Sequence, residues 1–337
     1  MDWYTIISNT LRSGITQQAI IFALAAIGLN LHFGYTGLLN FGQVGFMAAG
    51  AYGTGISIEE FGMPLIPAIG VGLAAGVVLA IILGYPTLRL RADYLAIVTI
   101  AIGEIIRFTV RAAALSDVTG GSNGINGFSN EFQSWNPLSG GKTYGFNLFG
   151  RINLRFTGAD LWEMFVGWML VFLCVFIVWR LVNSPWGRVV KSIREDEDAA
   201  TALGKNVFQF KMQSLILGGT FGAVAGIFYA VQQNSVQPDN YGTQQTFFAL
   251  TAAILGGLAR VWGPVVGSII FWMLLSAVEN ILIELIDAGI MPDWLMERSQ
   301  VGAVRFMLVG LTLMLLLVFR PQGIFGDKRE IAIDARK

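Results

Sequence analysis

The stretch GMPLIPAIGVGLAAGVVLAIILG, residues 62–84, contains no Asp, Glu, Lys or Arg. About 20 apolar residues in a helix cross the ~30 Å hydrocarbon core of a bilayer, so this stretch is long enough to span one. Further charge-free runs cover residues 13–58, 164–179, 240–259, 261–278 and 306–319. With a mean hydropathy of +0.62 over 337 residues, they predict an all-α polytopic membrane protein.

The charge-free runs predict about nine transmembrane helices, within a range of eight to ten, in a single transmembrane domain over residues 1–337. The expected spans are 16–34, 37–56, 64–84, 93–111, 160–182, 210–231, 245–259, 262–286 and 302–319. The seventh is short and interrupted by glycine, so we expect it to be re-entrant or broken.

The N-terminus and the single cysteine give little information on the cellular compartment of the protein. The chain starts MDWYTIISNT, with an acidic residue and no basic cluster before the first apolar run, so we expect this start to be retained rather than cleaved as a signal peptide. Cys174 is the only cysteine, which excludes an intrachain disulfide. It lies in an apolar span, where we expect a small hydrophobic side chain.

The basic residues are distributed unevenly over the predicted loops. If 85–92, 183–209, the turn at Arg260 and the tail 320–337 share one side, that side carries fourteen of the 22 Lys and Arg residues, counting Arg180 and Lys211 at the adjoining helix ends, and the other side carries eight. Cytoplasmic loops are enriched in Lys and Arg, so this side is expected to be cytoplasmic and the N-terminus external. Segment 112–159, rich in Gly, Ser and Asn, then becomes an external loop. It is either an ordinary surface loop or a partner-facing, substrate-gating one.

A few polar residues fall inside the predicted spans. Such groups are costly at membrane depth and usually face a bundle interior or an aqueous cavity. The candidates include Asn30, Thr99 and Arg305, together with Glu104 and Arg107. Because Glu104 and Arg107 are three residues apart on one helix, they can neutralise each other. We interpret them as a structural ion pair, with a place for Glu104 on the translocation path as the alternative.

The sequence GYTGLLNFGQVGFMAAGAYGTG, residues 34–55, places seven glycines around Asn40 and Gln43. Glycines let helices approach closely, and we expect this to explain most of them. They also permit an unwound stretch, which is tolerated at membrane depth only against protein or a water-filled path. For Asn40 and Gln43 we favour the path, and Thr99 and Glu104 are the further candidates for it.

No chemistry-bearing motif is apparent. The chain has no G-x-x-x-x-G-K-[ST] phosphate loop, no metal-ligand cluster and a single histidine, His32, which we expect to be an ordinary helix residue. We therefore expect no catalytic residue, cofactor or metal in this chain, and no nucleic-acid partner. Transport would then draw on an ion gradient or on another subunit.

The stretch SIREDEDAATALGKN, residues 192–206, places Arg194, Lys205 and four consecutive acids in a cytoplasmic loop. Ser192 and Glu195 match a capping box, and the acids would occupy a first helical turn, where the helix dipole favours them. Gly204 and Lys205 supply a stop. We expect a short helix of about ten residues, too short to be stable alone, that rests on something else. A solvated helix that touches nothing is the alternative.

At this point the sequence resembles a known family. DAATALG at 198–204 has the E/D-A-A-x-x-x-G pattern of the coupling loop in ABC importer permeases. The other motifs are GYTGLLNFGQ at 34–43, LRLRADYLAIVTIAIGEIIR at 88–107, TGGSNGI at 119–125, ILGGLARVWGPVVGS at 254–268 and FRPQGIFG at 319–326. Together they resemble the LivH/LivM family of permease subunits of branched-chain amino-acid importers, the LivM branch most closely. KNVFQFK after Gly204 departs from the apolar-Pro ending of other importers.

The resemblance implies a bacterial inner-membrane permease that pairs with a similar permease, two cytoplasmic ATPases and an extracytoplasmic substrate-binding protein. ATP and Mg²⁺ would be bound by the ATPases. The residues expected to couple to the ATPase are Arg194, Glu195, Asp196, Glu197, Asp198, Ala199, Ala200, Leu203 and Gly204. The acids would meet basic groups, while Ala199 and Leu203 would enter an apolar groove.

Two alternatives to this function remain. Within the family, urea and short-amide importers are alternatives to carriers of branched-chain or other neutral amino acids, and no residue separates them. In another class, the chain would be an ion-coupled secondary transporter that uses Glu104 as its proton or cation site.

Overall fold

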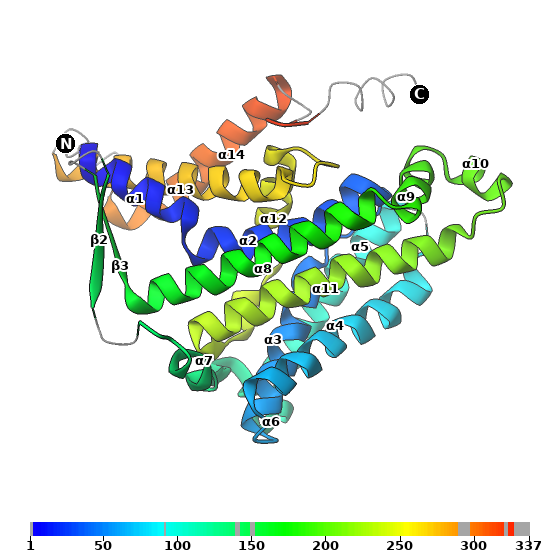
Figure 1. Cartoon of the computed structure of the whole chain (residues 1–337), viewed down its shortest axis with the longest axis horizontal. Coiled ribbons are helices and arrows are strands. Elements are labelled where there is room, and N and C mark those ends of the chain that lie inside the picture. The colour runs from blue at the N-terminus through cyan, green and yellow to red at the C-terminus, as the bar shows by residue number, and fades with distance from the viewer. Residues whose placement is uncertain are drawn as a thin grey trace.

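The computed structural model describes residues 3–90, 92–138, 142–148, 152–288, 297–319 and 323–326. This part of the chain is mostly helical (Figure 1). The longer helices are α1 (Trp3–Ile15), α2 (Gln17–Leu29), α3 (Gln43–Glu59), α4 (Leu65–Thr87), α5 (Ala92–Arg111), α8 (Gly158–Val182), α9 (Pro185–Glu195), α11 (Val207–Gln233), α12 (Thr243–Gly256), α13 (Gly263–Asp287) and α14 (Val301–Phe319). The short helices are η1, a π-helix (Asn30–Thr36), η2 (Ala113–Leu115), α6 (Ser116–Thr119), η3 (Gly121–Asn123), α7 (Asn130–Ser134), α10 (Glu197–Ala202), η4 (Pro238–Tyr241) and η5 (Arg298–Gln300).

Long apolar helices confirm an all-α membrane protein. Among the described residues, five helical segments are long and apolar enough to cross a membrane, namely 3–36, α4, α8, α11 and α13. Each of the other predicted spans also contains a helix: α3, α5, α12 and α14. At 1.5 Å per residue α12 is only about 21 Å long, shorter than a bilayer core, as expected for a broken span. The helix in predicted span 37–56 begins only at Gln43, because 37–42 is unwound.

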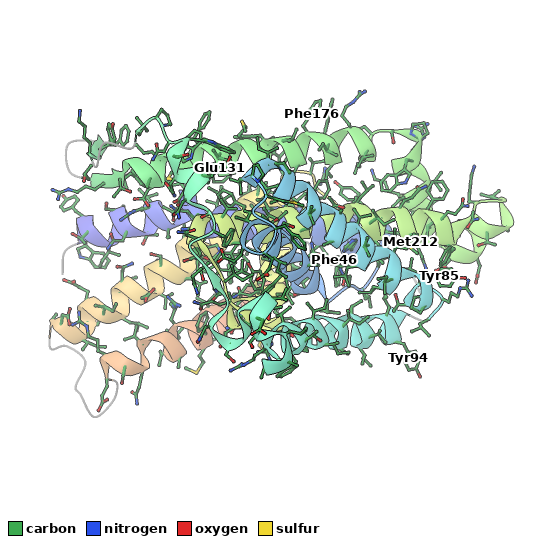
Figure 2. The ribbon with its side chains drawn as sticks, turned by 90° about the horizontal axis from the view of Figure 1, so that it is seen from below. Phe46, Tyr85, Tyr94, Glu131, Phe176 and Met212 are labelled. Atoms are coloured by element: carbon green, nitrogen blue, oxygen red, sulfur yellow. The ribbon has the colours of Figure 1, made fainter. Side chains whose placement is uncertain are left out.

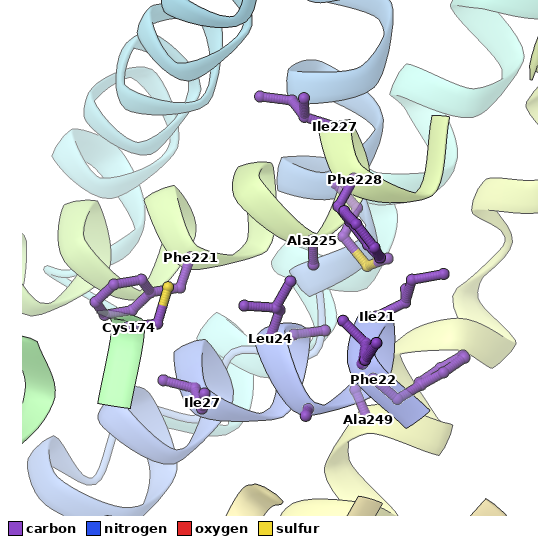
Figure 3. Close-up of a cluster of buried hydrophobic side chains, with 14 of the residues drawn as sticks. Ile21, Phe22, Leu24, Ile27, Cys174, Phe221, Ala225, Ile227, Phe228 and Ala249 are labelled. Carbon is purple, nitrogen blue, oxygen red and sulfur yellow. The ribbon is translucent and has the colours of Figure 1, made fainter. Parts of the chain in front are cut away.

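The core of the bundle lies where α2 crosses α11. Every residue of α2 from Ala19 to Leu29 is buried. Figure 3 shows Leu24 and Ile27 of α2 close to Ala225 and Phe221 of α11, with Cys174 of α8 beside them. Gly28 allows this close approach, because a Cβ there would lie 2.4 Å from the carbonyl oxygen of Gly218.

The surface of the bundle is apolar as well. Large hydrophobic side chains are exposed along α4, α5, α8 and α14. Figure 2 shows Phe176 of α8 and Tyr94 of α5 pointing outward at opposite edges, while Phe46 of α3 lies inside. An exterior with many exposed apolar side chains on a helical bundle is the surface expected of a chain that is solvated by lipid.

The segment predicted as the external loop 112–159 contains secondary structure. Strand β1 (Ile125–Asn126) pairs antiparallel with β4 (Ser235–Val236), and β2 (Thr143–Leu148) pairs with β3 (Ile152–Thr157) in a hairpin. The hairpin and α10 lie at opposite ends of the long axis of the molecule (Figure 1). This segment and the 183–209 loop are therefore far apart.

Candidate functional site

The charged stretch 192–206 does not start a helix at the predicted capping box. Pro185 begins α9, which runs through Ser192 to Glu195, and the Ser192 hydroxyl donates to the carbonyl of Val189 within that helix. The burial of Val190 and Ile193 on one face of α9 explains why the helix continues through Ser192. The prediction of a Ser192–Glu195 capping box was therefore wrong. Glu195 lies at the C-terminal end of α9 rather than in a first turn.

The short helix itself is α10, six residues long rather than about ten. Asp196 has an extended backbone and caps α10, since its carboxylate accepts from the Ala199 N–H at 2.9 Å. Glu197 and Asp198 occupy its first turn, as expected from the helix dipole. Gly204 has φ +76°, and the Lys205 N–H reaches the carbonyl of Ala200. This Schellman ending confirms Gly204 as the stop.

The side chains of α10 divide into an inner and an outer set. Ala200 is buried with Ile193 and Val207, so it packs within this chain. Ala199 is exposed, and 78% of Leu203 is exposed. Lys211 on α11 pairs with Glu197, which reduces the charge that Glu197 offers to a partner.

A cleft of about 690 Å³ opens beside α10. Its walls come from the end of η1, from segment 88–95 and from residues 193–198. The cleft is polar and charged, since Arg89, Arg194 and Lys211 line it together with the acids at 195–198. The 85–92 and 183–209 loops, which the distribution of basic residues assigned to one side, thus meet at one end of the molecule.

The glycine-rich break predicted near Asn40 exists. Residues 37–42 join η1 to α3 without helical structure. Their backbone is satisfied internally: the Phe41 N–H donates to Thr99 Oγ at 3.0 Å, and the Gly42 N–H donates to Asn40 Oδ1 at 2.9 Å. An unwound stretch can exist at membrane depth only with such partners.

Asn40, Gln43 and Thr99 meet at this break and are fully buried. Asn40 Nδ2 donates to His32 Nδ1 at 3.0 Å, and Gln43 Nε2 donates to the carbonyl of Gly218 at 3.0 Å. His32 lies in the π-helix η1, and its Nε2 is buried without a hydrogen-bond partner among the described residues. His32 thus lies in a helix, as predicted, but this helix is a π-helix, which is locally irregular.

Glu104 lies apart from the break and joins two helices. Its carboxylate accepts from Arg107 at 2.7 Å, which confirms the predicted ion pair. The same carboxylate accepts from the Thr243 hydroxyl at 2.6 Å and from the Thr243 N–H at 3.2 Å, at the start of α12. Asp239 extends the cluster through Arg107 at 3.6 Å and Arg111 at 2.9 Å. This arrangement satisfies the carboxylate as a helix cap.

A second interruption lies at 257–262, between α12 and α13. Asn30, predicted only as a polar residue inside a span, binds the backbone of this interruption: Oδ1 accepts from the Ala259 N–H at 2.8 Å and Nδ2 donates to the carbonyl of Arg260 at 2.9 Å.

The remaining charged residue predicted inside a span, Arg305, pairs with Glu279. Sequence patterns could not identify Thr243 as the partner of Glu104 or Lys211 as the partner of Glu197, because these contacts join distant helices. Among the described residues, no three His, Cys, Asp or Glu side chains gather as a metal site.

Known proteins resemble the chain over nearly its whole length. Residues 11–319 match the family described as "Branched-chain amino acid transport system / permease component". The high-affinity branched-chain amino acid transport system permease protein LivM of Escherichia coli is 29% identical over 94% of this chain and 70% of its own length. A probable LivM of Methanocaldococcus jannaschii is 25% identical over 94% of both chains.

More distant permeases match in part. The autoinducer 2 import system permease protein LsrC of Escherichia coli is 26% identical over 46% of this chain and 42% of its own. No solved structure is significantly similar to the chain. The family match covers the break at 37–42, α10 and the 257–262 interruption alike. The chain therefore belongs to the family of permease components of branched-chain amino acid transport systems.

Proposed function

We propose that this chain is one transmembrane subunit of an ABC importer for branched-chain or other neutral amino acids, driven by separate ATPase subunits. The observation that carries the proposal is α10, a capped helix that presents an exposed Leu203 at the end of a membrane bundle. Burial of a large apolar side chain in that position against a partner protein is energetically favourable. The relatives named LivM support the substrate class.

In the proposed arrangement the chain crosses the bacterial inner membrane about nine times. The 183–209 loop, the 85–92 loop and the C-terminal tail 320–337 face the cytoplasm, and the N-terminus and 112–159 face outward. The excess of Lys and Arg on the proposed cytoplasmic side supports this orientation. The shared cleft between 88–95 and 193–198 supports placing both loops on one side.

The proposed complex pairs this chain with a homologous permease, two ATPases that bind ATP and Mg²⁺, and an extracytoplasmic binding protein. ATP-driven closure of the ATPases would move α10 and shift the bundle between outward-open and inward-open states. Leu203 and Ala199 would contact the ATPase directly, and Gly204 and Asp196 would hold α10 in shape. Asp198 and Glu195 would add electrostatic attraction.

We propose that the translocation path passes the break at 37–42, near Asn40, Gln43 and Thr99. All three are fully buried, so the path would be closed here in this conformation. The unwound backbone at this depth supports the proposal, because such backbone lines a cavity in some conformations of transporters. The engagement of Glu104 with Arg107 and Thr243 favours a structural part for that residue.

Substrate competition tests the proposed class. In a strain that lacks its own importers, uptake of labelled leucine by the complete complex is measured with unlabelled leucine, alanine or urea present. Competition by leucine and other neutral amino acids supports the proposal. Absence of leucine uptake, with uptake of labelled urea or a labelled short amide by the same complex, would contradict it and assign the chain to the urea and amide branch.

A further inference from the structure

Helix α9 holds the π-helix η1 through two basic side chains. The Arg194 guanidinium donates to the carbonyl of Gly34, and the Lys191 ammonium lies 5.7 Å from the centre of the Tyr35 ring. These contacts join residues more than 150 positions apart in the sequence. They tie the cytoplasmic loop directly to a helix that continues into the membrane core.

The Gly34 carbonyl lies near the C-terminal end of η1, where the backbone carbonyls of a helix have no hydrogen-bond donor within the helix. The η1 helix ends at Thr36, and the last carbonyls of a helix have no intrahelical donor. The neighbouring His32 carbonyl receives the Leu38 N–H at 2.9 Å. Arg194 supplies a donor for Gly34, and a charged donor makes this bond stronger than a neutral one.

The stem of Arg194 also abuts the start of the unwound stretch. Gly37, its first residue, has φ +72°, and a Cβ added there would lie 3.3 Å from Arg194 Cγ. Three residues later, Asn40 holds His32 and Gln43. A displacement of Arg194 would therefore act both on Gly34, in the last turn of η1, and on Gly37, where the break begins.

Helix α10 is joined firmly to α9. Ile193 of α9, Ala200 of α10 and Val207 of α11 form one small apolar cluster. Glu197 of α10 pairs with Lys211 of α11, and Asp196 links the two helices without an intervening loop. A load on α10 is thus carried to α9 rather than absorbed by a flexible connection.

We propose that Arg194 is a positioning residue that transmits the movement of α10 to the helix break at 37–42. The proposal rests on the proposed function, because the load on α10 comes from the ATPase. It differs from the sequence-based expectation that Arg194 contacts the ATPase. Arg194 instead acts through the Gly34 carbonyl on the segment that closes the path.

The test compares Arg194→Met with Arg188→Ala in the complete complex. Methionine keeps an apolar stem beside Gly37 but removes the donors to Gly34. Arg188 is an exposed arginine on the same helix, so its replacement controls for the loss of one positive charge. ATPase co-purification, ATP hydrolysis and leucine uptake are measured for each, with Arg194→Lys as a variant that restores one donor.

A conformational readout separates transmission from mere stability. In a Cys174→Ala background, Leu39→Cys places one thiol in the break. Its rate of labelling by N-ethylmaleimide is compared between nucleotide-free and vanadate-trapped complexes. With Arg194 present, we expect the two rates to differ about threefold or more.

Arg194→Met is expected to retain the ATPase and its hydrolysis, to lose uptake about tenfold or more, and to abolish the difference in labelling. Arg194→Lys should recover part of the uptake. Uptake within about twofold of Arg188→Ala, with the labelling difference intact, would overturn the proposal. So would loss of the ATPase from the Arg194→Met complex, because Arg194 would then be a docking residue.

Failure of the proposed function gives a different result. The unmodified chain would then not co-purify with an ATPase at all, whatever residue occupies position 194. If Arg194→Met does not fold, Lys191→Ala replaces it, because that change removes the other contact of α9 with η1. Uptake and labelling at unmodified levels in Lys191→Ala would then overturn the proposal.

Discussion

Asn30 and Arg260 lie 230 residues apart, and the Asn30 amide donates to the Arg260 carbonyl at 2.9 Å. The same side chain accepts from the Ala259 N–H, so one amide satisfies a donor and an acceptor of the 257–262 turn. Asn30 itself begins η1, the helix that leads into the 37–42 break. The two interruptions of the bundle are therefore joined by a single residue.

Asn30→Ala should lower the stability of the folded chain. It leaves a backbone N–H and a carbonyl without their partner in a partly buried place, which costs up to about 1–3 kcal/mol for each group left unpaired. Thermal unfolding in detergent, followed by size-exclusion chromatography, measures the effect. Asn9→Ala is the control, since Asn9 makes an exposed amide pair with Asn280. Equal melting temperatures for the two variants would contradict the assignment.

Glu104→Gln should also lower stability, by about 1–3 kcal/mol, because it removes the charge that pairs with Arg107 and caps α12. Uptake per folded complex should stay within about threefold of the unmodified protein. Glu60→Gln, at an exposed glutamate, should change neither quantity. Loss of uptake at unchanged stability would instead place Glu104 on the path and favour the secondary-transporter alternative.

Gly204→Val should weaken ATPase association without unfolding the bundle. A Cβ at Gly204 meets nothing within 4 Å, so the effect comes from its φ of +76° alone. That backbone costs an ordinary residue about 1–2 kcal/mol, more for a β-branched one, whereas Asn tolerates it. Gly204→Asn is thus the matched control and should keep the ATPase in co-purification. Equal retention by both variants would show that the ending of α10 is irrelevant to docking.

Leu203→Asp should abolish ATPase co-purification while leaving the melting temperature unchanged. Since 78% of the Leu203 side chain is exposed, the substitution removes no contact of consequence within the chain. A charge placed in an apolar groove of the partner is strongly unfavourable. Leu115→Asp, at an exposed leucine of η2 in the 112–159 segment, controls for an added surface charge. Normal ATPase retention in Leu203→Asp would move the docking site to another loop, with 85–92 the first to examine.

The local features of the fold could be predicted from the sequence alone. Charge-free runs located the helices, and glycine clustering located the break near Asn40, because both depend on composition within a short window. The stop at Gly204 followed from the same reasoning. The start of the short helix did not, because Ser192 matches a capping pattern while the burial of Val190 and Ile193 extends α9 past it. Tertiary packing decided between two locally acceptable helix starts.

The contacts that assemble the site were beyond the sequence. Asn40, Gln43 and Thr99 were identified as polar residues in spans, but their meeting at one break depends on how α5 packs against α3. The bonds from Arg194 to Gly34 and from Glu104 to Thr243 join distant segments in the same way. A lone sequence carries residue types and spacing, and it holds no record of which helices become neighbours.

The central claim is that transport by this chain is driven by ATP on a partner subunit. Its most direct test is leucine uptake into proteoliposomes that contain this chain and its sister permease, with or without the ATPases and the binding protein. We predict uptake only when the ATPases, the binding protein and ATP are all present, and none on a proton or sodium gradient. Uptake driven by either gradient without any ATPase would contradict the account.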